Sequence, residues 1–179
     1  MPSVRKFDLA QLLLLFTCRA NPILGDFIRQ IYWPRYAAGY ASIANSEAQS
    51  FVSSATQEGK TAKPWSATVI RSIAGRLTGC CADYGMLERG IRKERRILPF
   101  RISPVAAAYL AYDLHFHGVS DGALPAHADW QLFGLAREDV IDELKRLSLR
   151  GLFIIQAAGE VIRISWKQPT IEAVCDVIA

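Results

Sequence analysis

The chain has 179 residues, of which 51% are hydrophobic and 21% charged, so it can bury a substantial core as a soluble globular protein. Its net charge of +4 suits a polyanionic partner without requiring one. The apolar run over residues 12–16 is far shorter than the ~20 residues of a membrane-spanning helix, and no clean cleavage site follows it. We therefore expect neither a membrane span nor a signal peptide.

The N-terminal third of the sequence predicts three helices. Residues 7–17 are hydrophobic on all faces, so we expect this helix to be buried between other elements. Residues 21–22 begin a second helix, which we expect to end at residues 33–34, and a third helix covers residues 45–56. An aromatic cluster near the end of the second helix either fills the core, as we expect, or stacks on nucleobases: Tyr32, Trp33, Tyr36 and Tyr40.

The stretch from Lys63 to Ile102 carries the clearest functional pattern. Ser66 is a good N-cap because its hydroxyl can accept hydrogen bonds from the first turn, and Gly85 is a natural stop. The core face of this helix is apolar, with Ile70, Ile73, Ala74, Leu77, Cys81 and Tyr84. The other faces suit a phosphate backbone or a groove, with Thr68, Arg71, Ser72, Gly75, Arg76 and Gly79. The simpler interpretation is a solvated helix face.

A cationic turn follows this helix. Only Glu88 and Glu94 oppose its basic residues, which are Arg89, Arg92, Lys93, Arg95, Arg96 and Arg101. Residues 96–102 alternate in part between basic and apolar side chains, which predicts a half-buried strand that Pro99 confines to a sheet edge. A helix, a basic loop and an edge strand occur in this order in a winged helix, where the helix enters a groove and the wing reaches a neighbouring phosphate.

The C-terminal half predicts the same order again. After a helix over residues 103–118, we expect a short helix near residues 128–133, a helix over residues 137–149, and a β-hairpin of strands 152–156 and 161–166. This second winged-helix pattern differs in charge, because its longer helix carries acidic residues that repel phosphate: Glu138, Asp139, Asp142 and Glu143. We expect this copy to pack on its neighbour or dock a protein rather than read DNA.

The sequence shows no pattern of catalysis or metal binding. Asp113, His115 and His117 lie two residues apart on one helix, whereas helical metal ligands are usually three or four apart, so we expect capping and core hydrogen bonds from them. The cysteines form no metal clip or disulfide framework and are expected to be buried thiols in a reducing cytoplasm: Cys18, Cys80, Cys81 and Cys175. We expect no enzyme activity, no catalytic residue, no metal and no cofactor.

These patterns predict a mainly α fold with small β-hairpins, a helical bundle that contains two winged-helix (helix-turn-helix) units. We expect the N-terminal helices and the first unit to occupy residues 1–102, and the second unit residues 103–179. The candidate DNA-binding residues are basic and small polar side chains of the first unit: Lys63, Ser66, Thr68, Arg71, Ser72, Arg76, Arg89, Arg92, Lys93, Arg95 and Arg96.

Five segments together resemble the BrxA family, small proteins encoded in bacterial BREX phage-defence islands: FIRQIYWPRYAAG, KPWSATVIRSIAGRLTGCCADYG, RRILPFRISP, AYLAYDLHFHG and DWQLFGLAREDVIDELKRLSLRG. The resemblance covers most of the chain and rests on overall pattern rather than on a catalytic signature. It implies a non-enzymatic, mostly helical protein with winged-helix parts, sometimes likened to the NusB antitermination fold, that binds DNA and serves the BREX system. Other BREX proteins are further partners that it implies, and catalysis would belong to them.

The leading hypothesis is a cytoplasmic accessory factor for phage defence that grips the backbone of double-stranded DNA with little sequence preference. The first alternative is a protein-interaction scaffold whose basic segment binds an acidic partner surface. The second alternative is RNA binding, which the aromatic cluster and the NusB likeness suggest. The sequence carries no signal for base preference or for oligomeric state.

Overall fold

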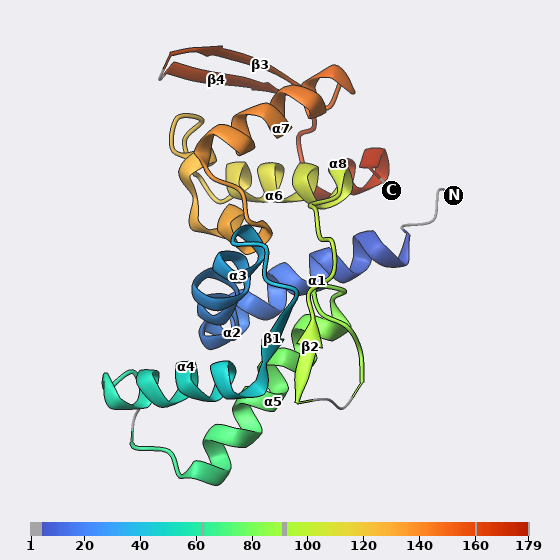
Figure 1. Ribbon diagram of the computed structural model, residues 1–179. Helices are drawn as coiled ribbons and strands as arrows, with labels where there is room; N and C mark the ends of the chain where they lie inside the picture. The colour runs from blue at the N-terminus through green and yellow to red at the C-terminus, as the bar shows by residue number, and fades with distance from the viewer. Residues whose placement is uncertain (1–4, 62, 91–92, 160, 179) are drawn as a thin grey trace. The chain divides into compact units, whose positions relative to one another are not determined.

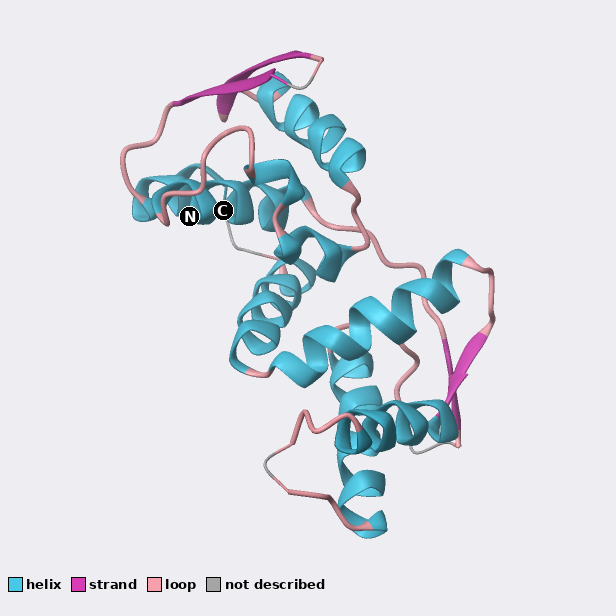
Figure 2. Cartoon of the chain, turned by 90° about the vertical axis from the view of Figure 1, so that its left-hand side faces the viewer, coloured by secondary structure: helices cyan, strands magenta, loops and turns pink. Residues whose placement is uncertain are grey.

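The computed structural model describes residues 5–61, 63–90, 93–159 and 161–178 (Figure 1). Helices predominate in these residues, and the strands form two short antiparallel sheets (Figure 2). The mainly helical fold class with small β elements is thereby confirmed. The chain divides into a C-terminal unit, Met1–Leu12 with Arg101–Ala179, and a central unit, Leu13–Phe100. The division into folding domains 1–102 and 103–179 stays a prediction.

Helix α1 contributes its first turns to the C-terminal unit and the remainder to the central unit. The elements up to the boundary are α1 (Lys6–Ala20), α2 (Pro22–Phe27), a π-helix (Ile28–Tyr32), α3 (Trp33–Ala37), β1 (Ser42–Ala44), α4 (Asn45–Gln57), α5 (Ala67–Asp83) and β2 (Glu94–Arg96). The C-terminal unit continues with α6 (Pro104–Phe116), two 3₁₀-helices (Leu124–Ala126 and Ala128–Phe133), α7 (Arg137–Leu149), β3 (Phe153–Ala158), β4 (Val161–Trp166) and α8 (Ile171–Ile178).

The second helical segment does not end at residues 33–34, so that prediction is wrong. The chain passes through the π-helix into α3, and the N–H of Trp33 reaches five residues back to the carbonyl of Ile28. Pro34 lies in the first turn of α3, where its missing N–H leaves no hydrogen bond unmade. The wider π turn therefore keeps the chain helical around a proline that would break a regular α-helix.

Helix α5 begins and ends where the sequence predicts. The Oγ of Ser66 accepts a hydrogen bond from the N–H of Val69 at 3.4 Å, which caps the first turn. The helix stops just before Gly85, whose φ of +80° is the left-handed conformation that glycine adopts without strain. Of its predicted core face, Ala74, Leu77 and Cys81 are buried, while Ile70, Ile73 and Tyr84 are half-buried.

The first sheet differs from the prediction. β1 pairs antiparallel with β2, with Ser42 opposite Arg96. On the other side of β2, the N–H of Glu88 donates to the carbonyl of Arg96 at 2.8 Å, and the N–H of Leu98 donates to the carbonyl of Met86 at 3.0 Å. The strand is thus flanked on both sides, and the edge strand that the sequence predicts over residues 96–102 is wrong. The pairing stops at Leu98 because Pro99, which follows, has no N–H to donate.

The C-terminal hairpin is confirmed. β3 and β4 pair in continuous register from Phe153 opposite Trp166 to Ala158 opposite Val161. A buried tyrosine, Tyr112 of α6, ties the hairpin to the helices, because its hydroxyl donates to the carbonyl of Leu152 at 2.5 Å and its ring contacts Phe153 and Trp166. The helix α6 itself is capped by Ser103 and closed at Gly118, as the sequence predicts.

Two expectations about burial are wrong. Helix α1 is apolar all round but packs on one face only, so Phe7, Leu9, Leu13 and Phe16 are each 44–49% exposed. Of the four thiols, Cys18 and Cys81 are buried, Cys80 is half-buried and Cys175 is exposed on the short helix α8. Among the described residues, no single helix is long and apolar enough to cross a membrane, although α1 and the bent helical segment after it reach that length together.

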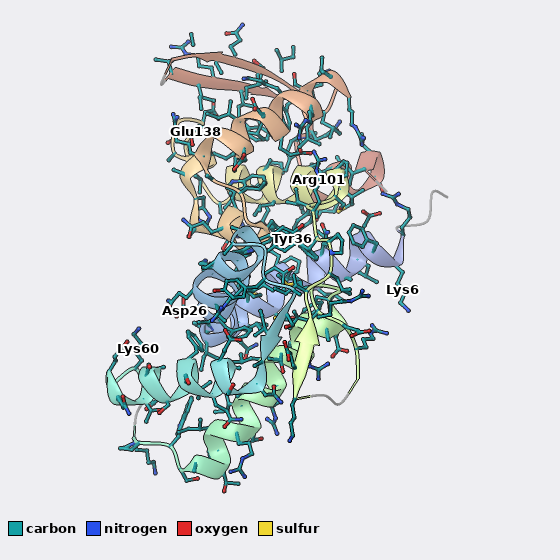
Figure 3. The ribbon with its side chains drawn as sticks, viewed as in Figure 1. Lys6, Asp26, Tyr36, Lys60, Arg101 and Glu138 are labelled. Carbon is teal, nitrogen blue, oxygen red and sulfur yellow. The ribbon has the colours of Figure 1, made fainter. Side chains whose placement is uncertain are left out.

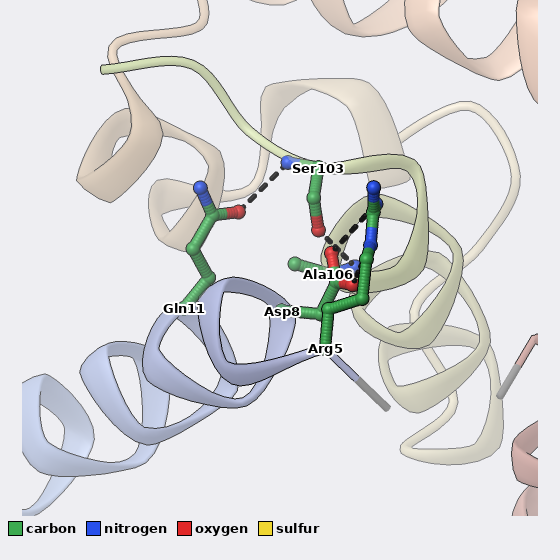
Figure 4. A network of polar contacts seen from close by, with 5 residues as sticks. All are labelled: Arg5, Asp8, Gln11, Ser103 and Ala106. Carbon is green, nitrogen blue, oxygen red and sulfur yellow. Dashed lines mark hydrogen bonds and ion pairs between the residues drawn. The ribbon is translucent and has the colours of Figure 1, made fainter. Parts of the chain in front are cut away.

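A buried glutamine attaches the first turns of α1 to the chain that enters α6 (Figure 4). The Nε2 of Gln11 donates to the carbonyl of Arg101 at 2.7 Å, and its Oε1 accepts from the N–H of Ser103 at 2.7 Å. Ser103 in turn caps α6 by accepting from the N–H of Ala106 at 3.1 Å. One side chain thus satisfies two backbone groups beside a helix start.

Replacement of this glutamine should destabilise the C-terminal unit. We expect Gln11→Leu to lower the free energy of unfolding by about 2–4 kcal/mol, because two buried backbone groups lose their partner. Chemical denaturation measures the loss, and faster hydrogen exchange of the Ser103 amide localises it. Gln131→Leu, an exposed position in the same unit, is the control and should leave both unchanged. Equal stability of the two variants would contradict the role assigned to Gln11.

Candidate nucleic-acid interface

One side of α5 faces solvent and carries a strip of small side chains between two arginines. We call Thr68, Arg71, Ser72, Gly75, Arg76 and Gly79 the α5 face. At ~100° per residue, the arc from Arg71 to Arg76 spans about 140°, and the small residues of the face fall inside it. Both arginines are exposed, as are Thr68 and Ser72. The predicted helical phase is therefore confirmed for these side chains.

The two glycines of the α5 face have no structural requirement inside the protein. A Cβ atom built on Gly75 or Gly79 would meet no heavy atom within 4 Å, and neither residue has a positive φ. Glycine within a helix is about 0.5–1 kcal/mol less favourable than alanine, so the two positions weaken α5 without serving its packing. What they provide is a helix surface that another molecule can approach closely.

The cationic turn lies near the C-terminal half of this helix. Arg89, Lys93 and Arg96 are all exposed. The Nη2 of Arg89 donates to the carbonyl of Asp83 at 3.3 Å, at the end of α5, and the carbonyl of Lys93 accepts from the N–H of Asn45 at 2.8 Å, at the start of α4. Glu94, the acidic residue that follows Lys93 in this turn, accepts a hydrogen bond from Ser42. Arg92 lies outside the described residues.

The side chain of Arg95 lies on the inner side of the sheet, unlike the exposed basic side chains of the turn. It stands opposite Ile43 in the sheet, and residues opposite one another share a face, so Arg95 lies on the side where Ile43 is fully buried. Its Nη1 donates to the carbonyl of Glu88 at 3.1 Å. Burial raises the pKa of the Cys81 thiol, and the nearby Arg95 guanidinium opposes that rise, which places the charge close to the core. The geometry gives Arg95 a structural role, and its role in DNA contact stays a prediction.

The remaining candidates, Lys63 and Ser66, are exposed at the start of α5. A helix of 17 residues at ~1.5 Å per residue is about 25 Å long, so these residues and Arg89 lie at its opposite ends. The structure therefore distributes the candidate residues along a line rather than gathering them at one point. Such a line can follow a polyanion over several charges, but it makes no enclosed site for one small anion.

The formal charge of the chain is concentrated in this region. Residues 63–96 contain eight basic and three acidic residues, a net charge of +5 against +4 for the whole chain. The rest of the molecule therefore carries a net charge of −1. The moderate total conceals a strongly basic segment, which is where a polyanion would be attracted.

The corresponding helix of the C-terminal unit, α7, presents a different surface. Asp142 and Glu143 pair with Lys145 and Arg146 of the same helix at 3.1 and 2.8 Å. Asp139 accepts a hydrogen bond from the N–H of Ala136 at 3.0 Å and caps the helix. The acids are thus engaged locally, and the charges of this helix nearly cancel.

The histidines make local contacts within the C-terminal unit, as expected. The Nδ1 of His117 lies 2.7 Å from the carbonyl of Asp113, and the ring of His115 stacks on Trp166 with centroids 4.3 Å apart. His127 accepts a hydrogen bond from the N–H of Asp129 at 3.3 Å. Within the part of the chain that the structure describes, no group of three or more His, Cys, Asp or Glu residues could hold a metal ion.

The family model for BrxA matches residues 5–113, more than half of the chain. The chain belongs to the BrxA family. This match covers the α5 face and the cationic turn, and it confirms the resemblance to the family over residues 5–113. BrxA proteins are a BREX accessory family that is not known to be enzymatic, so membership implies a BREX-associated protein. No curated protein and no solved structure matches the chain.

The different burial of Arg95 and Arg96 can be tested by measuring the stability of alanine variants. We expect Arg95→Ala to lower the free energy of unfolding by about 1–3 kcal/mol, because the carbonyl of Glu88 loses its donor and the packed stem of the arginine is removed. Arg96→Ala, at an exposed neighbouring position, should stay within about 0.5 kcal/mol of the parent. Thermal and chemical denaturation measure both, and similar values for the two variants would contradict an inward-facing Arg95.

Proposed function

We propose that this BrxA-family protein is a non-enzymatic DNA-binding accessory of a BREX-type phage-defence system. It holds duplex DNA mainly through backbone contacts and with little sequence preference. The observation that carries the proposal is the α5 face, a strip of small residues without an internal packing role, bordered by two exposed arginines and continued by a basic turn. Basic and small polar side chains of this kind are the usual partners of phosphate oxygens.

The order of the elements supports a winged-helix interpretation of the central unit. Helices α4 and α5 lie between β1 and β2, and the isolated bridge between Leu87 and Ile97 closes a hairpin directly after α5. In this interpretation α5 enters a groove, and the turn with Arg89 and Lys93 is the wing that reaches a neighbouring phosphate. The glycines let the backbone of α5 approach the duplex, and Arg71 and Arg76 contact phosphates on either side.

Low sequence preference follows from the side chains of the α5 face. Ser72 and Thr68 can donate to any phosphate, and the face holds no Asn or Gln, the side chains that bind adenine with two hydrogen bonds. Arginine can read guanine, but Arg71 and Arg76 lie at the borders of the strip, where they meet the backbone first. Most of the binding free energy would then be electrostatic and sensitive to salt.

The C-terminal unit supports a second winged-helix interpretation with another role. Its 3₁₀-helix, α7 and the β3–β4 hairpin follow the same order, but the acids of α7 would repel phosphate. We therefore assign this unit to packing or to docking of another protein, with other BREX proteins as the proposed partners and the cytoplasm as the proposed location. The same order of elements need not carry the same function.

Charge reversal tests the DNA surface. We expect Arg71→Glu with Arg76→Glu, and separately Lys93→Glu with Arg96→Glu, to weaken duplex binding equally across unrelated sequences. Each pair should reduce the slope of log affinity against log salt by about 1.8, since each lost phosphate contact contributes about 0.9. Fluorescence anisotropy over a salt series measures both. The matched control is Arg137→Glu with Lys145→Glu on α7, which changes the charge equally and should change neither.

Three outcomes would contradict the proposal. Unchanged affinity and slope in both pairs would remove the α5 face and the turn from the interface. No duplex binding by the parent protein, with loss of an acidic protein partner in the same variants, would favour the scaffold. Displacement of the duplex by equimolar single-stranded RNA would favour an RNA-binding function.

Replacement of the glycines of α5 should raise stability and weaken DNA binding. We expect Gly75→Ala and Gly79→Ala each to raise the free energy of unfolding by about 0.5–1 kcal/mol, because the added methyl group meets no atom of the protein and alanine favours the helix. Both should weaken duplex binding, since the methyl group keeps the backbone of α5 away from DNA. Thermal denaturation and anisotropy measure the two effects. Unchanged affinity in a stabilised variant would show that α5 does not approach the duplex closely.

A further inference from the structure

A cavity in the central unit is lined by no residue of the α5 face. It is bounded by α2, the last turn of α4 and the loop that leads to α5, and its volume is about 180 Å³. Its apolar wall includes Ile23 of α2, Phe51 and Ala55 of α4, and Trp65 of the loop. Apolar walls with a few polar groups at the edge are typical of small-molecule sites.

The cavity has two acidic side chains among its polar groups. Asp26 projects from α2 and lies 3.7 Å from the guanidinium of Arg29, and Glu58 is the C-cap residue of α4. The C-terminal end of a helix carries a partial negative charge, so the last turn of α4 adds to the field of the two carboxylates. Each of these groups favours a positive charge placed next to it.

The protein itself places a cation at this position. The ammonium group of Lys60 lies 2.7 Å from the carboxylate of Glu58, and Figure 3 shows Lys60 just beyond α4 and Asp26 on α2. The hydrogen bond to Glu58 is the first cause that raises the pKa of Lys60, and the charge of Asp26 adds to it. Both members of the Lys60–Glu58 pair are 56% exposed, so the pair is weak and easily exchanged for another cation.

We propose that this cavity binds an organic cation, a molecule or side chain with a positively charged nitrogen group on an apolar or aromatic body. The body lies against Phe51 and Trp65, where aromatic rings also favour a nearby cation. The charged nitrogen takes the place of the Lys60 ammonium beside Glu58 and Asp26. Binding at this site does not depend on the proposed DNA surface, because its wall contains no residue of the α5 face.

The experiment is an NMR titration of the full chain with benzamidine, followed at the indole N–H of Trp65 and the amides of the cavity wall. Benzamide, which has the same shape without the charge, is the matched neutral probe. We expect saturable shifts with benzamidine alone. Lys60→Ala should tighten binding by up to about fivefold, because a competing surface ion pair is removed. Asp26→Asn with Glu58→Gln should weaken it by about tenfold or more.

Glu138→Gln with Asp142→Asn, two exposed acids of α7, is the control for the loss of acidic charge and should bind benzamidine like the parent. A second arm compares putrescine with acetyl-arginine amide, which distinguishes a free amine from a side chain presented by a protein. The proposal is overturned if neither the parent nor Lys60→Ala shows saturable shifts at millimolar benzamidine. Equal binding of benzamide, or no weakening in the variant that lacks both carboxylates, would also overturn it.

Discussion

In the central unit, one polar link joins α4, α5 and the residue that precedes β2. The hydroxyl of Thr78, which is 1% exposed, donates to the Oδ1 of Asn45 at 3.2 Å, and the N–H of Asn45 donates to the carbonyl of Lys93 at 2.8 Å. The same hydroxyl also lies 3.3 and 3.2 Å from the carbonyls of Ala74 and Gly75, so it is satisfied within α5 as well. The link therefore acts together with the buried apolar face of α5, which turns the opposite strip to solvent, and it holds the cationic turn next to the start of α4.

The long helices of the two units, α5 and α7, differ in surface chemistry. In the central unit the arginines of α5 have no acid of their own helix within one turn, since its acid, Asp83, lies at the far end. In α7 two acids each lie three residues before a base, as Asp142 and Lys145 do, and therefore pair with it. The charge pattern along each helix decides whether its cations are available to a partner, and the fold does not.

Local signals in the sequence predict the helices well, but they do not predict strand pairing between distant residues. Ser66 and Gly85 mark the ends of α5 because caps act within one turn, and the spacing of Arg71 and Arg76 gives their exposure. The strand β1 has three residues and no alternating pattern, and its partner lies 50 residues away, so only the folded chain reveals it. The orientation of Arg95 depends on that register, so it cannot be predicted from the sequence either. No sequence motif indicates the cavity, because its walls come from three separate segments.

The two proposals give one small unit two surfaces that differ in local charge. The cavity beside α4 combines two carboxylates with the negative end of a helix, while the surface of α5 and its turn combines several cations with few acids. In the two proposals, a polyanion binds at the second and an organic cation at the first. Salt screens exposed charges beyond ~10 Å at ordinary ionic strength, so a ligand at either surface responds mainly to the charges next to it.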